Sequence, residues 1–168
     1  FKPRGLIRSD TFSLPIGDKF TLENYVTAFK RVDIGTAYVN SIVISGAVTV
    51  VVMVLAGLAA YAMVRYSFRL RGFLHSMIIA SMMFPVFSTI IPVFRMESSW
   101  GIVNTGSIWL TRLSVVLPQI AGNLSFAIIV LMGFIRSLPV DLEEAAYLEG
   151  YNVYQIFFRI IMPLAKPS

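Results

Sequence analysis

Apolar residues dominate three long stretches of the chain, and the charged residues collect between them. Residues 34–64, 72–94 and 113–135 contain no aspartate, glutamate, lysine or arginine. A helix needs about 20 apolar residues to cross the roughly 30 Å hydrocarbon core of a bilayer, and each stretch reaches that length. The pattern therefore predicts an all-α membrane protein. We expect its transmembrane helices over about 39–64, 73–94 and 113–135.

Small residues and prolines indicate how the first two predicted helices pack. Ala56 and Ala60 lie four residues apart with Gly57 between them, a spacing that lets helices approach closely in lipid. Pro85 and Pro92 interrupt the second stretch, and each removes a backbone hydrogen-bond donor. We therefore expect close packing along the first helix and a kink in the second.

The loop between the first two predicted helices sets the topology. It carries Arg65, Arg69 and Arg71 without any acidic residue. Placing three arginines at mid-bilayer would cost about 8–10 kcal/mol, and short cytoplasmic loops are enriched in basic residues. We expect this loop in the cytoplasm. Residues 1–38 and the loop 95–112 then lie outside, and the segment after the third helix returns to the cytoplasm.

In this scheme residues 1–38 form an extracytoplasmic lead, ahead of a transmembrane core over 39–168. Prolines and glycines in the lead predict an irregular backbone. Within it, residues 20–32 have a helical pattern with Thr21 as the N-cap. The apolar face of that helix consists of Leu22, Tyr25, Val26 and Phe29. Such a face suits a helix packed at the membrane interface, with contact to an external partner as the alternative.

The composition narrows the classes of function. Hydrophobic residues make up 57% of the 168 positions and charged residues 14%, which is unlike a soluble domain. The net charge of +5 is what basic cytoplasmic loops produce, so it does not indicate a nucleic-acid partner. The chain has no cysteine, one histidine, no phosphate-binding loop and no catalytic constellation. We expect no enzymatic activity, cofactor or metal. His75 fits either a solvated interfacial side chain or a titrating switch.

Three polar side chains lie in the third predicted helix, namely Gln119, Asn123 and Ser125. Uncharged polar groups within lipid usually hydrogen-bond across to another helix. The same groups suit a solute path, where they would hydrogen-bond a polar solute. The sequence leaves both interpretations open.

A short acidic segment follows the third predicted helix. Pro139 suits a first helical turn and Gly150 suits a left-handed helix end, so we expect a helix over about 140–150. Its first turn is acidic, which complements the helix dipole. Apolar residues then return, and we expect the start of another span over about 155–168. A short helix between two apolar segments suits docking against another protein, with a position on the lipid surface as the alternative.

The same segment resembles the EAA signature of the membrane subunits of binding-protein-dependent ABC importers. That signature has E-A-A, three residues, G, nine residues and then I-x-L-P, and the spacing here matches it throughout. Met162 replaces the usual leucine, and Glu149 stands where aspartate is common. In the family this segment is a coupling helix that docks on the cytoplasmic ATPase. The resemblance assigns ATPase coupling to Glu144, Ala145, Ala146, Glu149, Gly150, Ile160 and Pro163.

Other stretches are similar to carbohydrate-uptake permeases of the maltose type (MalG-like). They are KPR near the start, FTLENY, Asn40-Ser41, AAYAMVRYSF, MMFP with a second proline seven residues on, and GIVNT. The resemblance implies a MetI-like permease fold with six spans. This fragment would supply about three full spans, the second to fourth, with the coupling helix and the start of the fifth. It also implies a multi-pass protein of a bacterial or archaeal plasma (inner) membrane.

The function that the resemblance implies is that of a permease subunit in an ATP-driven sugar importer. Its partners would be cytoplasmic ABC ATPase subunits, a second permease subunit, an extracytoplasmic solute-binding protein and the lipid bilayer. Three alternatives stay open. They are an importer for a peptide, amino acid, phosphate or polyamine, a membrane interaction subunit without transport, and an ion-coupled carrier. The uncharged spans disfavour the carrier, because such carriers commonly place ionisable residues within the membrane.

Overall fold

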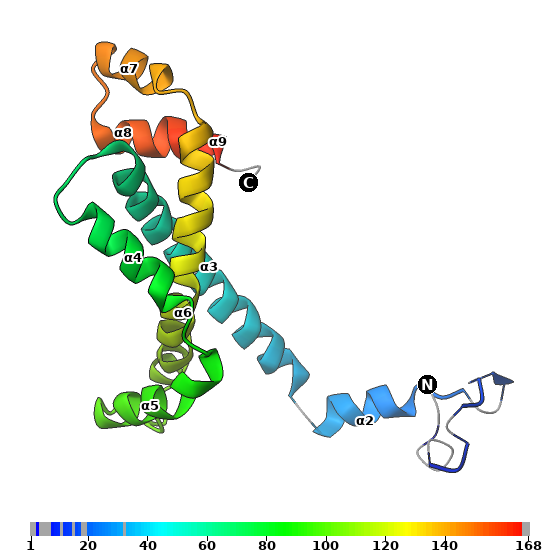
Figure 1. Cartoon of the computed structure of the whole chain (residues 1–168). Coiled ribbons are helices and arrows are strands. Elements are labelled where there is room, and N and C mark those ends of the chain that lie inside the picture. The colour runs from blue at the N-terminus through cyan, green and yellow to red at the C-terminus, as the bar shows by residue number, and fades with distance from the viewer. Residues whose placement is uncertain are drawn as a thin grey trace. The chain divides into compact units, whose positions relative to one another are not determined.

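The computed structural model of the chain describes residues 3, 8–10, 12–14, 16–17, 20–31 and 33–165, apart from the Val86 side chain. Across these ranges all regular structure is helical, in agreement with the predicted all-α class (Figure 1). The longer helices are α2 (Glu23–Arg31), α3 (Ile34–Arg65), α4 (Arg71–Ser81), α5 (Val86–Ser99), α6 (Ile108–Ser137) and α7 (Asp141–Leu148). A last segment combines α8 (Val153–Ile156), the π-helix η2 (Phe157–Ile161) and α9 (Met162–Leu164). Much of the predicted lead and the end of the predicted last span, residues 166–168, lie outside the described residues.

The chain divides into two compact units, residues 1–43 and 44–168. In the first unit, the Thr21 hydroxyl accepts a hydrogen bond from the Glu23 amide at 3.1 Å, just ahead of α2. This contact fits the predicted start of the helix. No residue of α2 is buried, so its apolar face is exposed within the unit.

The start of α3 depends on an acidic cap that the sequence analysis missed. The Asp33 carboxylate accepts hydrogen bonds from the amide and the hydroxyl of Thr36, at 3.1 and 2.6 Å. An aspartate just before a helix satisfies backbone amides that have no partner within the helix. The side-chain bond from Thr36, followed by the backbone bond, holds the pKa of Asp33 below its usual value.

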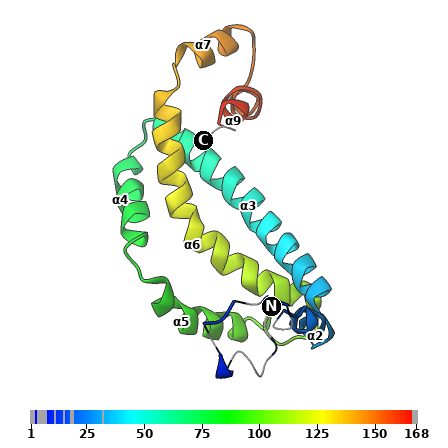
Figure 2. The ribbon, with the colours of Figure 1, turned by 90° about the vertical axis from the view of Figure 1, so that its right-hand side faces the viewer.

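Two helices among the described residues are long and apolar enough to cross a membrane, α3 with 32 residues and α6 with 30. They contain the first and third predicted spans, and each extends beyond the predicted bounds. In the second unit α4 runs alongside α6, and α4 and α5 both contact α6 (Figure 2).

The second predicted span is not one kinked helix, which corrects the sequence analysis. Helix α4 ends at Ser81 and α5 begins only at Val86. Pro85 lies between them, and a proline both lacks an amide proton and disfavours helical backbone in the residue before it. The resulting helices have 11 and 14 residues, so each is shorter than the roughly 20 residues that a span requires. Pro92 lies inside α5 without ending it.

The core of the second unit lies where α3, α6, α7 and the last segment meet. Its buried cluster consists of Ala56, Ala60, Tyr61, Met63, Ile128, Leu131, Met132, Ile135, Ala146, Ile156, Phe157 and Ile161. The small residues of α3 allow this packing, as predicted, since Ala56 and Ala60 are completely buried. Gly57 lies against the ring of Phe157, and a Cβ added there would be 3.0 Å from its Cζ atom. The close approach therefore joins α3 to η2.

Replacing Gly57 with valine should lower the stability of the protein. The new side chain would collide with Phe157, and overpacking of this kind costs about 1–3 kcal/mol. Gly46→Val is the matched control, because an added Cβ at this position of the same helix meets nothing within 4 Å. Thermal unfolding of the full-length protein in detergent measures both variants. Equal shifts of Tm in the two variants would contradict the close packing of Gly57 against Phe157.

Candidate functional site

Helix α7 is a separate short element between α6 and α8 (Figure 1). Its first turn carries the acidic residues predicted there. Just beyond its last residue lies Gly150, whose φ of 86° is left-handed, as predicted. The Gly150 amide donates to the Tyr147 carbonyl and the Tyr151 amide to the Ala146 carbonyl, both at 3.0 Å. This pair of bonds is a Schellman motif, so the chain turns sharply as it leaves α7.

The segment after α7 begins with a capping box. The Asn152 side chain accepts a hydrogen bond from the Gln155 amide at 2.9 Å, and the Gln155 side chain accepts one from the Asn152 amide at 2.8 Å. An Asn-x-x-Gln spacing is a sequence signal for a helix start. The span predicted from about residue 155 was not based on this signal.

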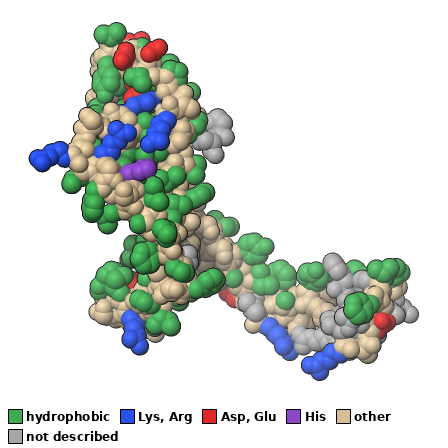
Figure 3. All heavy atoms as spheres, in the orientation of Figure 1, with side chains coloured by type: hydrophobic (Ala, Val, Ile, Leu, Met, Phe, Trp, Pro, Cys, Tyr) green, Lys and Arg blue, Asp and Glu red, His purple; other side chains and the backbone are tan. Residues whose placement is uncertain are grey.

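Helix α7 has one buried face and one exposed face. Glu143 and Ala146 are buried, at 4% and 5% exposure. Glu144 and Ala145 are exposed, as are Glu149 and Gly150 just beyond the helix. Figure 3 shows exposed acidic side chains at the end of the second unit where α7 lies. The motif residues on and next to α7 therefore lie on two faces, with Ala146 packed against the core and Glu144, Ala145, Glu149 and Gly150 exposed.

The buried face is held by ionic and hydrogen-bonding contacts to the end of α3. The Tyr61 hydroxyl donates to Glu143 Oε2 at 2.8 Å, and Arg65 Nε donates to Glu143 Oε1 at 2.5 Å. Arg65 Nη2 also donates to the Leu138 carbonyl at 3.0 Å, where α6 ends. We call this set of contacts, made by Tyr61, Arg65, Glu143 and the Leu138 carbonyl, the Glu143 clasp.

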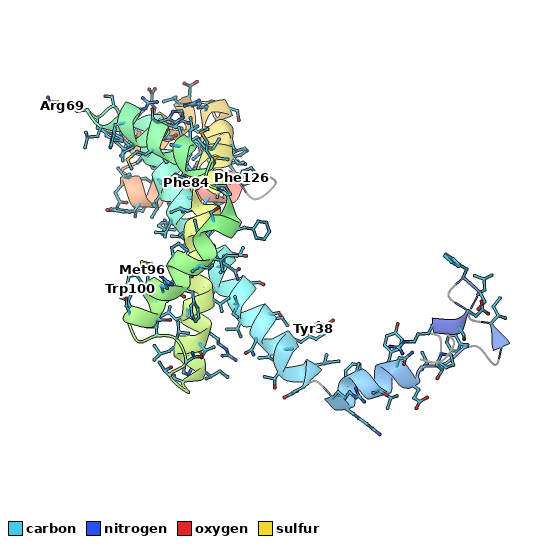
Figure 4. The ribbon with its side chains drawn as sticks, turned by 60° about the horizontal axis from the view of Figure 1, so that its bottom comes forward. Tyr38, Arg69, Phe84, Met96, Trp100 and Phe126 are labelled. Atoms are coloured by element: carbon cyan, nitrogen blue, oxygen red, sulfur yellow. The ribbon has the colours of Figure 1, made fainter. Side chains whose placement is uncertain are left out.

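The clasp changes the interpretation of two residues. Arg65 was predicted to lie in a cytoplasmic loop at the membrane surface, but its side chain is only 13% exposed because it pairs with Glu143. From the sequence, Glu143 was interpreted only as one of the acidic residues that complement the helix dipole. Nothing in the local sequence reveals a partner about 80 positions upstream. Arg69, by contrast, projects away from the helices in the loop before α4 (Figure 4).

An aromatic contact lies beside the clasp. Tyr66 follows the last residue of α3, and its ring meets that of Tyr61 edge to face at 6.1 Å. The neighbouring phenol of Tyr147 on α7, with a smaller effect of burial, raises the pKa of the Tyr66 phenol.

The last two motif residues lie away from the exposed face of α7. Ile160 belongs to η2 and packs against the core, while Pro163 lines an apolar cavity of about 540 Å³. The π-turn closes with a hydrogen bond from the Met162 amide to the Phe157 carbonyl, directly before the proline. Glu144 to Gly150 thus lie on α7 and the turn after it, whereas Ile160 and Pro163 belong to the last segment.

The predicted polar residues of α6 fall into two groups. Gln119 and Asn123 line a cavity of about 390 Å³ between α3 and α6. Ser125 instead makes a 2.6 Å hydrogen bond with Ser81 of α4, which is a helix-packing contact. From α3, Ser45 and Thr49 also line the cavity. The sequence analysis missed these two, although their spacing of four residues places them on one helix face.

These features define a class: a helical membrane protein that presents a short acidic helix at one end. Residues 53–168 match the family model described as binding-protein-dependent transport system inner membrane component. The chain belongs to this family, whose members are inner-membrane components of transport systems.

Three curated relatives illustrate the match. The chain is 35% identical over 168 residues to the diacetylchitobiose uptake system permease protein NgcG of Streptomyces coelicolor, covering 100% of this chain and 53% of the relative. It is 36% identical over 148 residues to the trehalose transport system permease protein SugB of Mycobacterium tuberculosis (88% and 52% covered). It is 30% identical over 148 residues to the melibiose/raffinose/stachyose import permease protein MelC of Bacillus subtilis (88% and 51%). The chain spans about half the length of these relatives.

Proposed function

We propose that the full-length protein is the permease subunit of an ATP-driven sugar importer. The family match and the sugar-uptake names of the similar proteins support the class of transport. The observation that carries the coupling role is the two-faced α7, which is anchored on one face and exposed on the other. A helix presented in this way suits a helix-in-groove contact.

In this proposal α7 lies at the cytoplasmic face and docks in a groove of an ATPase subunit. The small side chain of Ala145 permits close approach, and Glu144 meets a basic partner. A solute-binding protein delivers the sugar outside, and a second permease subunit completes the path. ATP-driven closure of the ATPases displaces α7 and produces alternating access. The displacement requires that α7 contact the two ATPase states differently.

The finer fold assignment belongs to the same proposal. We infer a MetI-like arrangement in which α4 and α5, although separate helices, together occupy the place of the second predicted span. Helices α3 and α6 then supply the other two full spans, and the segment from α8 onward begins the next. The fit of α4 and α5 along α6 supports this assignment.

The cavity lined by Gln119 and Asn123 forms part of the solute path in this proposal. Amide and hydroxyl groups that surround an apolar wall match a sugar, which has hydroxyl groups around an apolar ring face. A charged cargo such as phosphate or polyamine would favour a charged lining, and the residues that line this cavity are uncharged.

A pair of neighbouring alanines tests the docking role. Ala145→Leu enlarges the exposed face, so the ATPase should no longer copurify with the full-length protein while Tm stays unchanged. Ala146→Leu overpacks the buried face and should lower stability by about 1–3 kcal/mol. Copurification and thermal unfolding are measured on both variants. Retention of the ATPase at the wild-type level by Ala145→Leu would count against docking through this face.

A second pair tests the solute path. Asn123→Leu removes a polar group from the cavity and should reduce uptake of labelled diacetylchitobiose, trehalose or raffinose, whichever the wild type transports, by about fivefold to tenfold. Ser125→Ala removes a hydroxyl that bonds to α4 and should leave the KM for uptake unchanged. Uptake by Asn123→Leu at the wild-type rate would exclude this cavity from the path. If the wild-type protein takes up a peptide or an amino acid instead of a sugar, the proposed cargo is wrong.

A further inference from the structure

The Glu143 clasp joins three helix ends at one point. Tyr61 and Arg65 are four residues apart on the last turns of α3, so both donors project from one face of that helix. Each donor binds a different oxygen of the same carboxylate. Arg65 simultaneously reaches the carbonyl of Leu138, the residue that follows α6. A single side chain of α7 is thereby fixed to α3, and the arginine that fixes it also holds the end of α6.

The burial of Glu143 makes these contacts obligatory. A carboxylate at 4% exposure has lost nearly all of its water, so its charge requires donors from the protein. Removal of one partner from a buried pair leaves an uncompensated charge and is strongly unfavourable. The docked position of α7 is therefore strongly preferred over positions in which Glu143 leaves its two donors.

Without the clasp, the covalent chain would connect α7 only to α6 and α8. The connections are short, residues 138–140 and 149–152, and the second contains the left-handed turn at Gly150. Neither connection leads to α3, which precedes α7 by some 76 residues, from Arg65 to Asp141. Helix α3 nevertheless contributes Ser45 and Thr49 to the polar cavity. A displacement of α7 reaches that wall of the cavity through contacts between side chains.

We propose that Glu143 is a positioning residue that makes α7 and the end of α3 move as one rigid body. This inference rests on the proposed function, because it concerns how a displacement of α7 by the ATPase reaches the solute path. The exposed Glu144 meets the partner, and the buried Glu143 transmits the movement inward. Two adjacent glutamates of α7 thus have different tasks, set by the helix face on which each lies.

Distance measurement between two spin labels tests the rigid connection. The 168 residues contain no cysteine, so cysteines placed at Leu142 on α7 and at Leu55 on α3 give a unique pair in this region. Both positions are exposed, at 43% and 45%. The full-length protein is measured alone, then with the ATPase, and then with ATP and vanadate. We expect one narrow distance distribution that stays the same in all three states.

Glu143→Ala should lower the ratio of docked to undocked α7 by at least about tenfold, which appears as a second, broad distance population. Glu144→Ala is the matched control and should leave the distribution narrow. Tyr61→Phe removes only one donor and should produce a smaller broad population. This variant replaces Glu143→Ala in the test if Glu143→Ala fails to fold. Glu143→Gln keeps an acceptor for Arg65 and should restore part of the docked population.

Two results would overturn the inference. One is a wild-type distribution in both Glu143→Ala and Tyr61→Phe. The other is a wild-type distance between α7 and α3 that changes when ATP and vanadate bind, since the two elements would then move separately. Failure of the wild-type protein to bind an ATPase would refute the proposed function instead, and the distances in the protein alone would still decide whether Glu143 holds α7 in place.

Discussion

A carboxylate buried where three helices meet requires donors, and this requirement organises the end of the second unit where α7 lies. Glu143 accepts one hydrogen bond from Tyr61 and a charge-assisted hydrogen bond from Arg65. Charge-assisted bonds are roughly twice as strong as neutral ones, and their strength increases in surroundings with little water. Because the donors are on α3 and the acceptor is on α7, the contact fixes α7 to a helix that is distant from it in the sequence. The orientation of α7, and therefore which of its residues are exposed, follows from this contact.

The apolar packing below the clasp supports the same arrangement. Ala56, Gly57 and Ala60 leave room for the ring of Phe157, and that ring also contacts Tyr61, with 5.7 Å between ring centroids. Elsewhere large apolar side chains are exposed, including Met83 at 80% around the break between α4 and α5. A protein surrounded by water rarely exposes extended apolar surface. A bilayer provides the surroundings that such a surface requires.

Local patterns in the sequence were enough to predict much of this structure. Long uncharged stretches predicted the helices α3 and α6, and Gly150 predicted a left-handed helix end because few other residues tolerate that backbone. Features that depend on distant partners were missed. The pairing of Glu143 with Arg65 links positions far apart in the chain, and Ser125 bonds to a helix that precedes its own. The sequence also could not distinguish a kink from a break at Pro85, since neighbouring contacts decide whether a helix resumes after a proline.

A double-mutant cycle on the ion pair tests the central claim most directly. Unfolding free energies of the full-length protein would be measured by denaturant titration in detergent for Arg65→Met, Glu143→Leu and the combined variant. Each single change leaves a charge without its partner and should cost about 3 kcal/mol or more, whereas the double change removes both charges. The account predicts that the double variant loses less than the sum of the single losses, by at least about 1 kcal/mol. Strictly additive losses would show that the two side chains do not interact and would contradict the account.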